Sequence, residues 1–299
     1  MAPTAPIVNA MSVDVEDYYQ VSAFDAVVSR DTWDRLESRV AANSERLLRL
    51  FDDCGVKATF FVLGWVAERH RALVARIVAA GHEIASHGYG HRLIYEQSPE
   101  EFRADLRRSK GILEDASGTR VRGYRAPSYS ITKRSLWALD VLVEEGFDYD
   151  ASIFPVHHDR YGIPDAPRDI HLVQRSRGAL LEVPPSTVRL GGVNLPIAGG
   201  GYFRLLPFWW TRWGIARVNQ VERWPVIFYL HPWEVDPDQP RLRASALSRF
   251  RHYRNLRKTE PRLRALCREF RFAPIAEVLR TAMPAAAPST VAANAGGAP

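Results

Sequence analysis

Apolar runs with the length of β-strands alternate with amphipathic helical patterns along most of this 299-residue chain. In the helical segments, apolar residues recur three and four positions apart, whereas the runs between them are short and continuously apolar, as buried strands are. Strands that alternate with helices usually pair in parallel, so this order predicts an α/β fold with a parallel sheet, either open or closed into a barrel. The predicted strands are 7–15, 58–63, 83–86, 123–125, 147–151, 180–183 and 226–230.

The helices between these strands are predicted from apolar stripes and from residues typical of helix ends. Ser98, Pro99 and Glu101 are the N-cap, first and third residues of a capping box, so a helix is expected to begin there. This helix should run to Gly118, because glycine commonly follows the last helical residue. Other helices are predicted over 40–51, 66–78 and 133–145, with an arginine-rich outer helix within 241–272.

The composition is that of a globular protein with a substantial core, at 46% hydrophobic and 25% charged residues. We expect a single barrel-like domain over residues 1–283, in which residues from about 241 to 283 form a C-terminal helical extension. Residues 284–299 are rich in alanine and proline and are predicted to be a disordered tail. Neither a signal peptide nor an apolar run long enough to span a bilayer is visible, so a cytoplasmic location is expected.

The chain is basic, with a formal net charge of +6 and a pI near 9.5. The charges are spread widely and match no nucleic-acid-binding motif, so nucleic acid is not an expected partner. A positive surface leaves open a contact with an anionic polymer, with the inner membrane or with glycan-assembly machinery.

Chemically active side chains lie at the ends of five of the predicted strands or directly after them. They are Asp14, His87, Arg125, Asp150 and His231. Parallel sheets and barrels place their ligands at the carboxyl ends of the strands. The sequence therefore predicts that these residues gather at one site.

His87 and His91 stand four residues apart, downstream of the acidic cluster 14–17. Two imidazoles and one carboxylate bind a divalent metal and leave positions open for water, as a hydrolytic site requires. Asp14 and Glu16 would share one face of a strand, whereas Asp17 would point away unless a bulge intervenes. Glu16 is therefore the favoured third ligand, with Asp17 as the alternative. Zn²⁺ suits such ligands best, and Co²⁺ or Ni²⁺ would also fit.

The remaining polar residues supply the other groups that a metal-dependent hydrolase needs. One carboxylate of the acidic cluster would bind the metal, and a second, unligated one would take a proton from water. Arg125 near Asp14 would keep that carboxylate ionised and orient it. His231 ends a buried run and suits a general acid with a pKa near neutral. Each residue alone also fits a structural role, as a surface charge or a hydrogen-bonded core histidine.

These motifs, in this order, resemble the polysaccharide deacetylases of carbohydrate esterase family 4, also called the NodB homology domain. The similarity is greatest to the subgroup encoded beside exosortase exopolysaccharide loci and extends over roughly residues 7–280. It implies a distorted (β/α)7 barrel that removes N-acetyl groups from amino sugars of an exopolysaccharide or its precursor with the help of a metal. The matching segments are 12–19, 81–91, 123–130, 228–234 and 252–255.

By motif position, the resemblance implies that Asp14 is the base, that His87 and His91 bind metal, that Arg125 orients the base and that His231 is the acid. Many family members have two adjacent aspartates at the first motif, whereas here Val15 separates the acidic residues, so the third ligand is Glu16 or Asp17. The usual Arg-Pro-Pro-Tyr is altered to Arg-Ala-Pro-Ser at 125–128. Substrate contacts are expected from Ser128, Tyr129, Asp150 and Trp233.

Two other functions remain open from the sequence. One is an amide hydrolase acting on a small ureide or cyclic imide with the same barrel, and the other is a non-catalytic glycan-binding protein. A long open groove with exposed aromatic residues would favour a glycan, whereas a closed and capped pocket would favour a small molecule.

Overall fold

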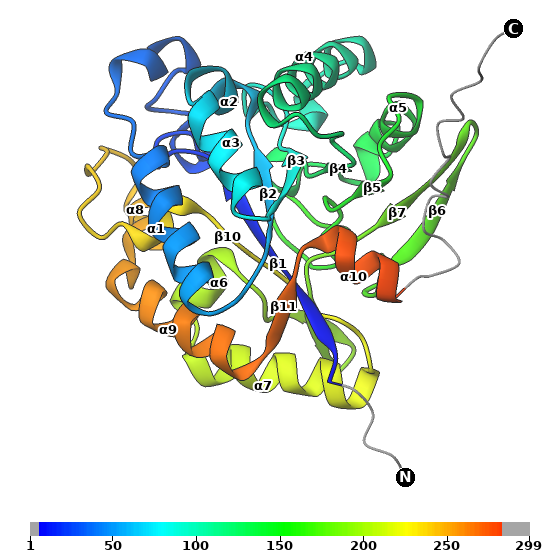
Figure 1. Ribbon diagram of the computed structural model, residues 1–299. Helices are drawn as coiled ribbons and strands as arrows, with labels where there is room; N and C mark the ends of the chain where they lie inside the picture. Colours follow the sequence, from blue (N-terminus) through cyan, green and yellow to red (C-terminus); the bar gives the residue numbers. More distant parts are fainter. Residues whose placement is uncertain (1–5, 283–299) are drawn as a thin grey trace, which may run out of the picture.

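The computed structural model describes residues 6–282, so the predicted disordered tail at 284–299 lies outside the described residues (Figure 1). A nine-stranded sheet forms its centre. Neighbouring strands are parallel throughout, except that β6 is antiparallel to β7. The predicted α/β fold with a parallel sheet is therefore confirmed. The order is β10 (Ile227–Leu230), β1 (Val8–Val15), β2 (Thr59–Val62), β3 (Glu83–Ser86), β4 (Gly123–Tyr124), β5 (Tyr149–Asp150), β7 (Gly178–Glu182) and β6 (His171–Arg175).

The parallel path from β10 to β7 has the strand count of a (β/α)7 arrangement, but its two ends are not joined by a strand ladder within the described residues. They nevertheless come close together. Beyond β7, the backbone N–H of Ser186 donates to the carbonyl of Ile227 in β10 (3.4 Å), and the N–H of Ile227 donates to Ser186 Oγ (2.8 Å). The segment after β7 thus lies against the opposite end of the sheet, and a closed barrel stays a prediction.

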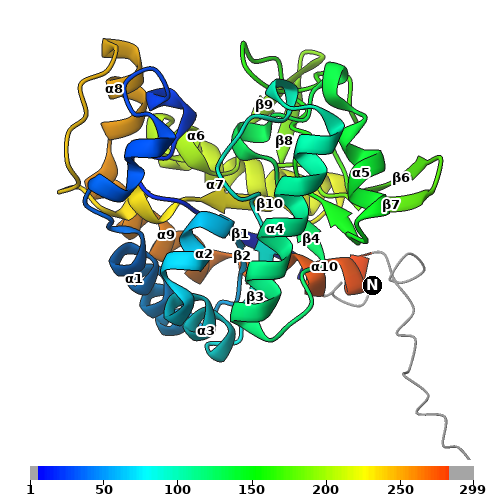
Figure 2. The ribbon, with the colours of Figure 1, turned by 90° about the horizontal axis from the view of Figure 1, so that it is seen from above.

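Helices cover the outer side of the sheet (Figures 1 and 2), whereas α10 (Ile275–Ala282) packs in a smaller apolar cluster inside it. The capping box at Ser98 is present, because Ser98 Oγ accepts from the N–H of Glu101 and the Glu101 carboxylate accepts from the N–H of Ser98. The helix predicted over 66–78 is instead two helices that break at His70. The helices are α1 (Val40–Asp53), α2 (Gly64–Arg69), α3 (Arg71–Ala79), α4 (Pro99–Ser117), α5 (Ala138–Glu144), α6 (Gly200–Leu205), α7 (Phe208–Arg217), α8 (Ala246–Tyr253), α9 (Leu256–Glu269) and α10 (Ile275–Ala282).

The C-terminal segment contains a strand that the sequence did not reveal. β11 (Arg271–Ala273) pairs in parallel with the first residues of β1, and the N–H of Ile275 donates to Thr59 Oγ1 (2.7 Å). The segment therefore extends the central sheet as well as adding the outer helices α8 and α9. β11 is partly exposed and has no continuous apolar run, and the same reason explains why β6 and the hairpin of β8 (Thr187–Leu190) and β9 (Val193–Pro196) were not predicted.

The alternation along β1 determines where the polar site forms. Met11, Val13 and Val15 pack in the large cluster between the sheet and the helices, whereas Ala10 packs in the smaller cluster inside the sheet. Because successive side chains of a strand point to opposite faces, Ser12 and Asp14 share the inner face with Ala10. The inner face thus changes from apolar to polar toward the carboxyl end of the strand. Within residues 6–282, no helix is both long enough and apolar enough to cross a bilayer.

Close packing of β4 against β5 gives a prediction about stability. A Cβ atom on Gly123 would lie only 2.0 Å from Cζ of Tyr149, so Gly123→Ala should lower the free energy of unfolding by about 2 kcal/mol. The matched control is Gly111→Ala, because Gly111 lies within α4 with open space around it, and this change should raise stability by about 0.5–1 kcal/mol. Urea unfolding of both variants measures the difference, and equal effects would contradict this account of the packing.

Candidate active site and metal centre

Residues at the carboxyl ends of the parallel strands meet at one cavity of about 310 Å³. Segments far apart in the sequence complete its walls, namely residues 21–23, 158–161 and 245–252. The sequence did not identify residues 21–23 or 245–251 as parts of a site, since nothing in their residue pattern marks them as functional. The residues expected to be functional that line the cavity are Asp14, Glu16, His87, His91, Ser128, Tyr129, His231 and Trp233.

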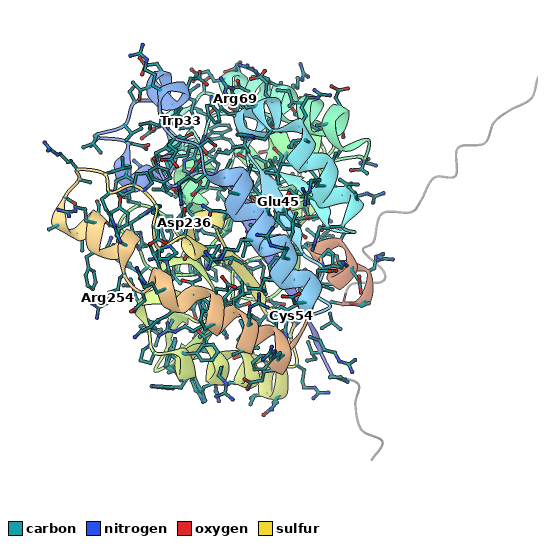
Figure 3. The ribbon with its side chains drawn as sticks, turned by 60° about the vertical axis from the view of Figure 1, so that its left-hand side comes forward. Trp33, Glu45, Cys54, Arg69, Asp236 and Arg254 are labelled. Atoms are coloured by element: carbon teal, nitrogen blue, oxygen red, sulfur yellow. The ribbon has the colours of Figure 1, made fainter. Side chains whose placement is uncertain are left out.

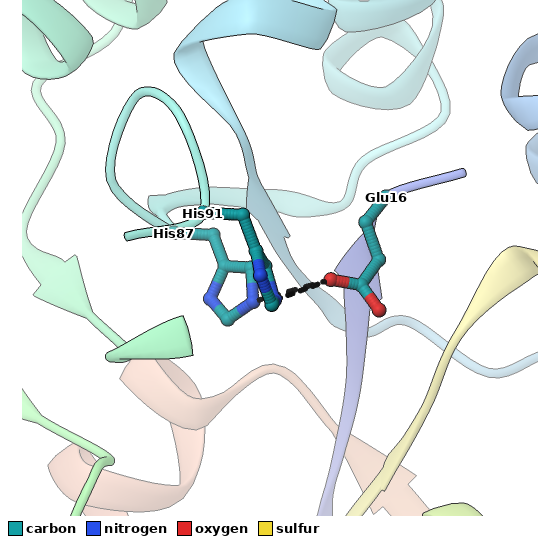
Figure 4. A group of neighbouring side chains, drawn as sticks. All are labelled: Glu16, His87 and His91. Carbon is teal, nitrogen blue, oxygen red and sulfur yellow. Dashed lines mark ion pairs between the residues drawn. The ribbon is translucent and has the colours of Figure 1, made fainter. Parts of the chain in front are cut away.

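Glu16, His87 and His91 form a compact buried cluster (Figure 4). One ligand atom from each residue lies within 4.8 Å of those of the other two. His91 Nε2 is 2.8 Å and His87 Nε2 is 3.9 Å from Glu16 Oε2. Glu16 follows β1, and the two histidines lie in the loop after β3, so three neighbouring parallel strands bring the cluster together.

The electrostatics of this cluster fit a divalent cation. His87 Nδ1 is 2.8 Å from the backbone carbonyl of Arg125, so its N–H donates there and leaves the lone pair of Nε2 facing Glu16. Burial lowers the pKa of His87 to about 4, which keeps the ring neutral. Burial alone would raise the pKa of Glu16, but the charge and close polar contact of His91 and the charge of His231 lower it to about 2. Glu16 Oε2 is buried and accepts no well-formed hydrogen bond from any described residue, so a cation would satisfy it.

Asp17, the alternative ligand, points away from the two histidines. Its carboxylate accepts hydrogen bonds from the backbone N–H groups of Arg39 (2.8 Å), Val40 (3.1 Å) and Tyr18 (3.0 Å). Arg39 is the N-cap residue of α1 and Val40 its first residue, so Asp17 satisfies amide groups that the helix itself leaves unpaired. Burial raises the pKa of Asp17 to about 6. The structure therefore brings Glu16, and not Asp17, to the histidine pair.

Asp14 and Arg125 form a buried ion pair beside the cluster. Arg125 Nη1 donates to Asp14 Oδ1 (2.6 Å) and to Ser12 Oγ (2.9 Å), and its Nε donates to the carbonyl of Ala151 (3.2 Å). The guanidinium also lies 4.1 Å from the centre of the Phe61 ring. These contacts fix one oxygen of Asp14 and leave Oδ2 on the side of His231, 3.9 Å from its Nε2.

His231 follows β10, the strand that neighbours β1, and faces the carboxylates from there. Its Nδ1 lies 2.7 Å from Glu234 Oε1, and Glu234 Oε2 accepts from Arg204 Nε (2.5 Å). Burial lowers the pKa of His231, but the hydrogen bond to Glu234 and the charges of Glu16 and Asp14 outweigh it and raise the pKa to about 9. A protonated imidazole thus points Nε2 toward Glu16 Oε1 (3.7 Å).

Glu234 and Arg204 were not identified from the sequence, although both are fully buried next to a predicted functional residue. The spacing of Glu234, three residues after His231, could have suggested their pairing, because the backbone N–H of His231 also donates to this carboxylate. No comparable signal exists for Arg204, which approaches from α6.

The four expected substrate contacts differ in their positions. Ser128 and Tyr129 line the cavity with φ angles of 51° and 54°, a left-handed conformation that concentrates at functional sites. Trp233 lines it as well, but its Nε1–H donates to Glu16 Oε1 (3.3 Å), so it also orients that carboxylate. Asp150 does not line the cavity. Its carboxylate accepts from Ser152 Oγ (2.5 Å), which supports the loop of Arg125 from behind.

Two family models match successive parts of the chain. Residues 24–143 match the family described as polysaccharide deacetylase, and residues 151–280 match a domain of unknown function, DUF3473. The first match includes His87, His91 and Arg125, whereas Glu16 precedes it and His231 lies within the second. Residues 24–143 thus match a polysaccharide deacetylase domain, the class of domain that the sequence motifs resemble.

Curated relatives support this assignment over part of the chain. Peptidoglycan deacetylase-like protein FGM2 of Gibberella zeae is 29% identical over 154 residues, which are 50% of this chain and 45% of that protein. Peptidoglycan deacetylase of Helicobacter pylori is 32% identical over 114 residues, which are 38% of this chain and 37% of that protein. The chain therefore spans less than half the length of these relatives.

Solved structures share the fold over nearly the whole chain. A Mycobacterium smegmatis protein described as a polysaccharide deacetylase has a TM-score of 0.64 at 19% identity, covering 94% of this chain and 92% of that one. PuuE allantoinase has a TM-score of 0.60 at 15% identity, covering 94% and 93%. At these identities the likeness shows the fold alone.

The different surroundings of Glu16 and Asp17 predict different effects of substitution on stability. Asp17→Ala should lower the free energy of unfolding by about 2 kcal/mol, because the first amides of α1 lose their buried acceptor. Glu16→Gln keeps an acceptor for Trp233 and removes no backbone hydrogen bond, so its stability should stay close to that of the unchanged chain. Thermal and urea unfolding compare the two variants, and the reverse order of stability would contradict these roles.

Proposed function

We propose that this chain is a metal-dependent hydrolase that removes N-acetyl groups from amino sugars of an exopolysaccharide or its precursor. The observation that carries this proposal is the convergence of Glu16, His87 and His91 with Asp14 and His231 on one cavity. The polysaccharide deacetylase domain supports it, as do relatives named for the deacetylation of peptidoglycan. Zn²⁺ fits a carboxylate and two imidazoles best, and Co²⁺ or Ni²⁺ would use the same ligands.

In this proposal Asp14 is the general base. A divalent cation bound by Glu16, His87 and His91 would polarise the acetamide carbonyl and activate water for attack. Arg125 orients Asp14 through Oδ1, so Oδ2 is left to take the proton from the attacking water. The backbone at Ser128 and Tyr129 lies at the cavity wall, where it would contact the substrate.

His231 is the general acid of the proposed reaction. Its raised pKa means that it carries a proton at neutral pH and can donate it to the amine that leaves the acetyl group. Glu234 fixes the ring by accepting from Nδ1, and Arg204 fixes Glu234 in turn. Nε2, the atom that would donate the proton, is thereby aimed into the cavity.

Hydrolysis of a small ureide or cyclic imide remains a second candidate. The cavity has a modest volume, and segments from three separate parts of the chain border it. The two candidates give different products. Acetate would be released only from an N-acetylated sugar, whereas ring opening or loss of urea would mark the small-molecule reaction. Mass spectrometry of candidate substrates after incubation with the protein separates the two.

Removal of the metal should abolish the proposed activity. Treatment with a chelator, or the substitution His87→Ala, should lower acetate release from N-acetylglucosamine oligomers by about 100-fold or more. Loss of a residue that hydrogen-bonds to a metal ligand typically costs about 10–100-fold in metal affinity or activity, so loss of the ligand itself should cost at least as much. His171→Ala is the matched control, because this histidine lies in β6 and does not line the cavity. Full activity in the chelated protein would refute the proposal.

The proton donor can be tested separately from the metal. His231→Asn should lower kcat for acetate release by about 10²–10⁴-fold with little change in metal content, because it removes the acid and no metal ligand. Glu234→Gln should also lower kcat, but by a smaller factor. The imidazole ring of His231 keeps its position, and only the negative charge beside it is lost. Glu222→Gln, a change of the same type paired with Arg168 outside the cavity, serves as control. An unchanged kcat in His231→Asn would remove it from the mechanism.

A further inference from the structure

The mouth of the cavity is bordered by α8, a short helix with large apolar side chains directed to solvent. Ser245, Leu247, Ser248 and Arg251 line the cavity, and Leu247 is 57% exposed. Phe250, one turn further along, is 52% exposed. Figures 1 and 2 show α8 beside the loop that follows β1, at the periphery of the molecule. Exposed apolar residues next to a binding cavity commonly mark an interaction surface.

The exposed residues of α8 form a continuous stripe. Leu247, Phe250 and Arg251 are spaced three and four positions apart and therefore share one face of the helix, and Arg254 follows directly after its last residue. A further apolar residue lies close by, because Val27, which is 51% exposed, borders a second hollow together with Ser245 and Ser248 of the α8 segment. We call Val27, Leu247 and Phe250 the apolar rim.

The segment around the apolar rim is positively charged. Residues 239–259 contain no acidic side chain. Two of the guanidinium groups lie over aromatic rings, Arg254 over Phe250 (5.6 Å) and Arg241 over Tyr253 (4.2 Å), and Figure 3 shows Arg254 at the outer edge of the molecule. In both contacts the charged guanidinium group itself lies over the ring, so positive charge and aromatic surface occupy the same part of this face. The basic residues are Arg241, Arg243, Arg249, Arg251, Arg254, Arg257 and Lys258.

We propose that the apolar rim and the arginines around it dock this protein on an anionic lipid surface, so that the cavity receives an acetylated sugar presented at the membrane. Aliphatic and aromatic side chains at the centre with arginines around them are the pattern of helices that lie in a lipid interface, where the apolar groups enter the acyl region and the arginines contact lipid phosphates. A soluble anionic glycan would pair with the arginines but would leave Leu247 and Val27 exposed to water. The substrate part of this inference rests on the proposed function, whereas the docking does not.

Vesicle binding tests the docking directly. The full chain should co-sediment with vesicles of phosphatidylglycerol and phosphatidylcholine, weakly or not at all with phosphatidylcholine alone, and less at higher ionic strength. The double variant Leu247→Asp, Phe250→Asp should bind the anionic vesicles at least about tenfold more weakly, because two side chains that enter the lipid become charged. Arg249→Gln with Arg254→Gln should weaken binding about tenfold and reduce its dependence on salt.

A matched control distinguishes this surface from other exposed aromatic groups. Trp209 on α7 is 62% exposed but does not line the cavity, so Trp209→Asp should bind vesicles as the unchanged chain does. The metal-site variant His87→Ala should also bind unchanged, so a failure of the proposed hydrolase would not affect this result. All changed rim residues are exposed, and thermal unfolding verifies that the variants remain folded.

Three results would overturn the proposal. The first is no binding of the full chain to anionic vesicles at low salt. The second is binding that depends on Trp209 and not on Leu247 and Phe250. The third is binding of a soluble anionic polysaccharide such as alginate through the same arginines, with no binding to vesicles, which would assign the surface to a free glycan.

Discussion

The site depends on the hydrogen bonds and the ion pair that the buried guanidinium group of Arg125 forms. Its side chain joins Asp14 of β1 to the carbonyl of Ala151 beyond β5, and its own carbonyl orients His87. A charge removed from water is costly unless it is paired and hydrogen-bonded, and here Asp14, Ser12 and Ala151 provide those partners. One residue therefore fixes both a carboxylate and an imidazole of the candidate centre, so the geometry of the base and of the metal ligand cannot vary independently.

Charge balance across the cavity explains why so many ionisable groups can be buried together. Asp14 is neutralised by Arg125 and Glu234 by Arg204, and each of these pairs is almost wholly removed from solvent. Glu16 and the protonated His231 then face each other as the remaining opposite charges. A cation at Glu16 would add positive charge next to His231 and favour the release of its proton, which is the direction that a general acid requires.

Much of the arrangement could be predicted from local patterns, and the exceptions have physical reasons. The apolar runs located the strands, and the two-residue period of β1 placed Asp14 and Glu16 on one face. By contrast, Arg204 reaches Glu234 across 30 positions of sequence through packing alone, which no local pattern records. Asp150 also follows a strand, but its hydrogen bond to Ser152 turns it away from the cavity. Very short strands such as β11 depend on their neighbour more than on their own residues.

The two matched regions of the chain contribute different halves of the candidate site, and Arg204 joins the parts of the second half to one another. The first region and the residues before it provide the carboxylates and the two imidazoles, whereas the second provides His231, Glu234 and the wall formed by α8. Arg204 donates through Nε to Glu234 and through Nη1 to the carbonyls of Arg251, His252 and Arg254 at the end of α8. The same buried guanidinium thus positions the candidate acid and the helix at the cavity mouth. A displacement of α8 would consequently disturb the hydrogen bonds that fix Glu234 and, through it, the ring of His231.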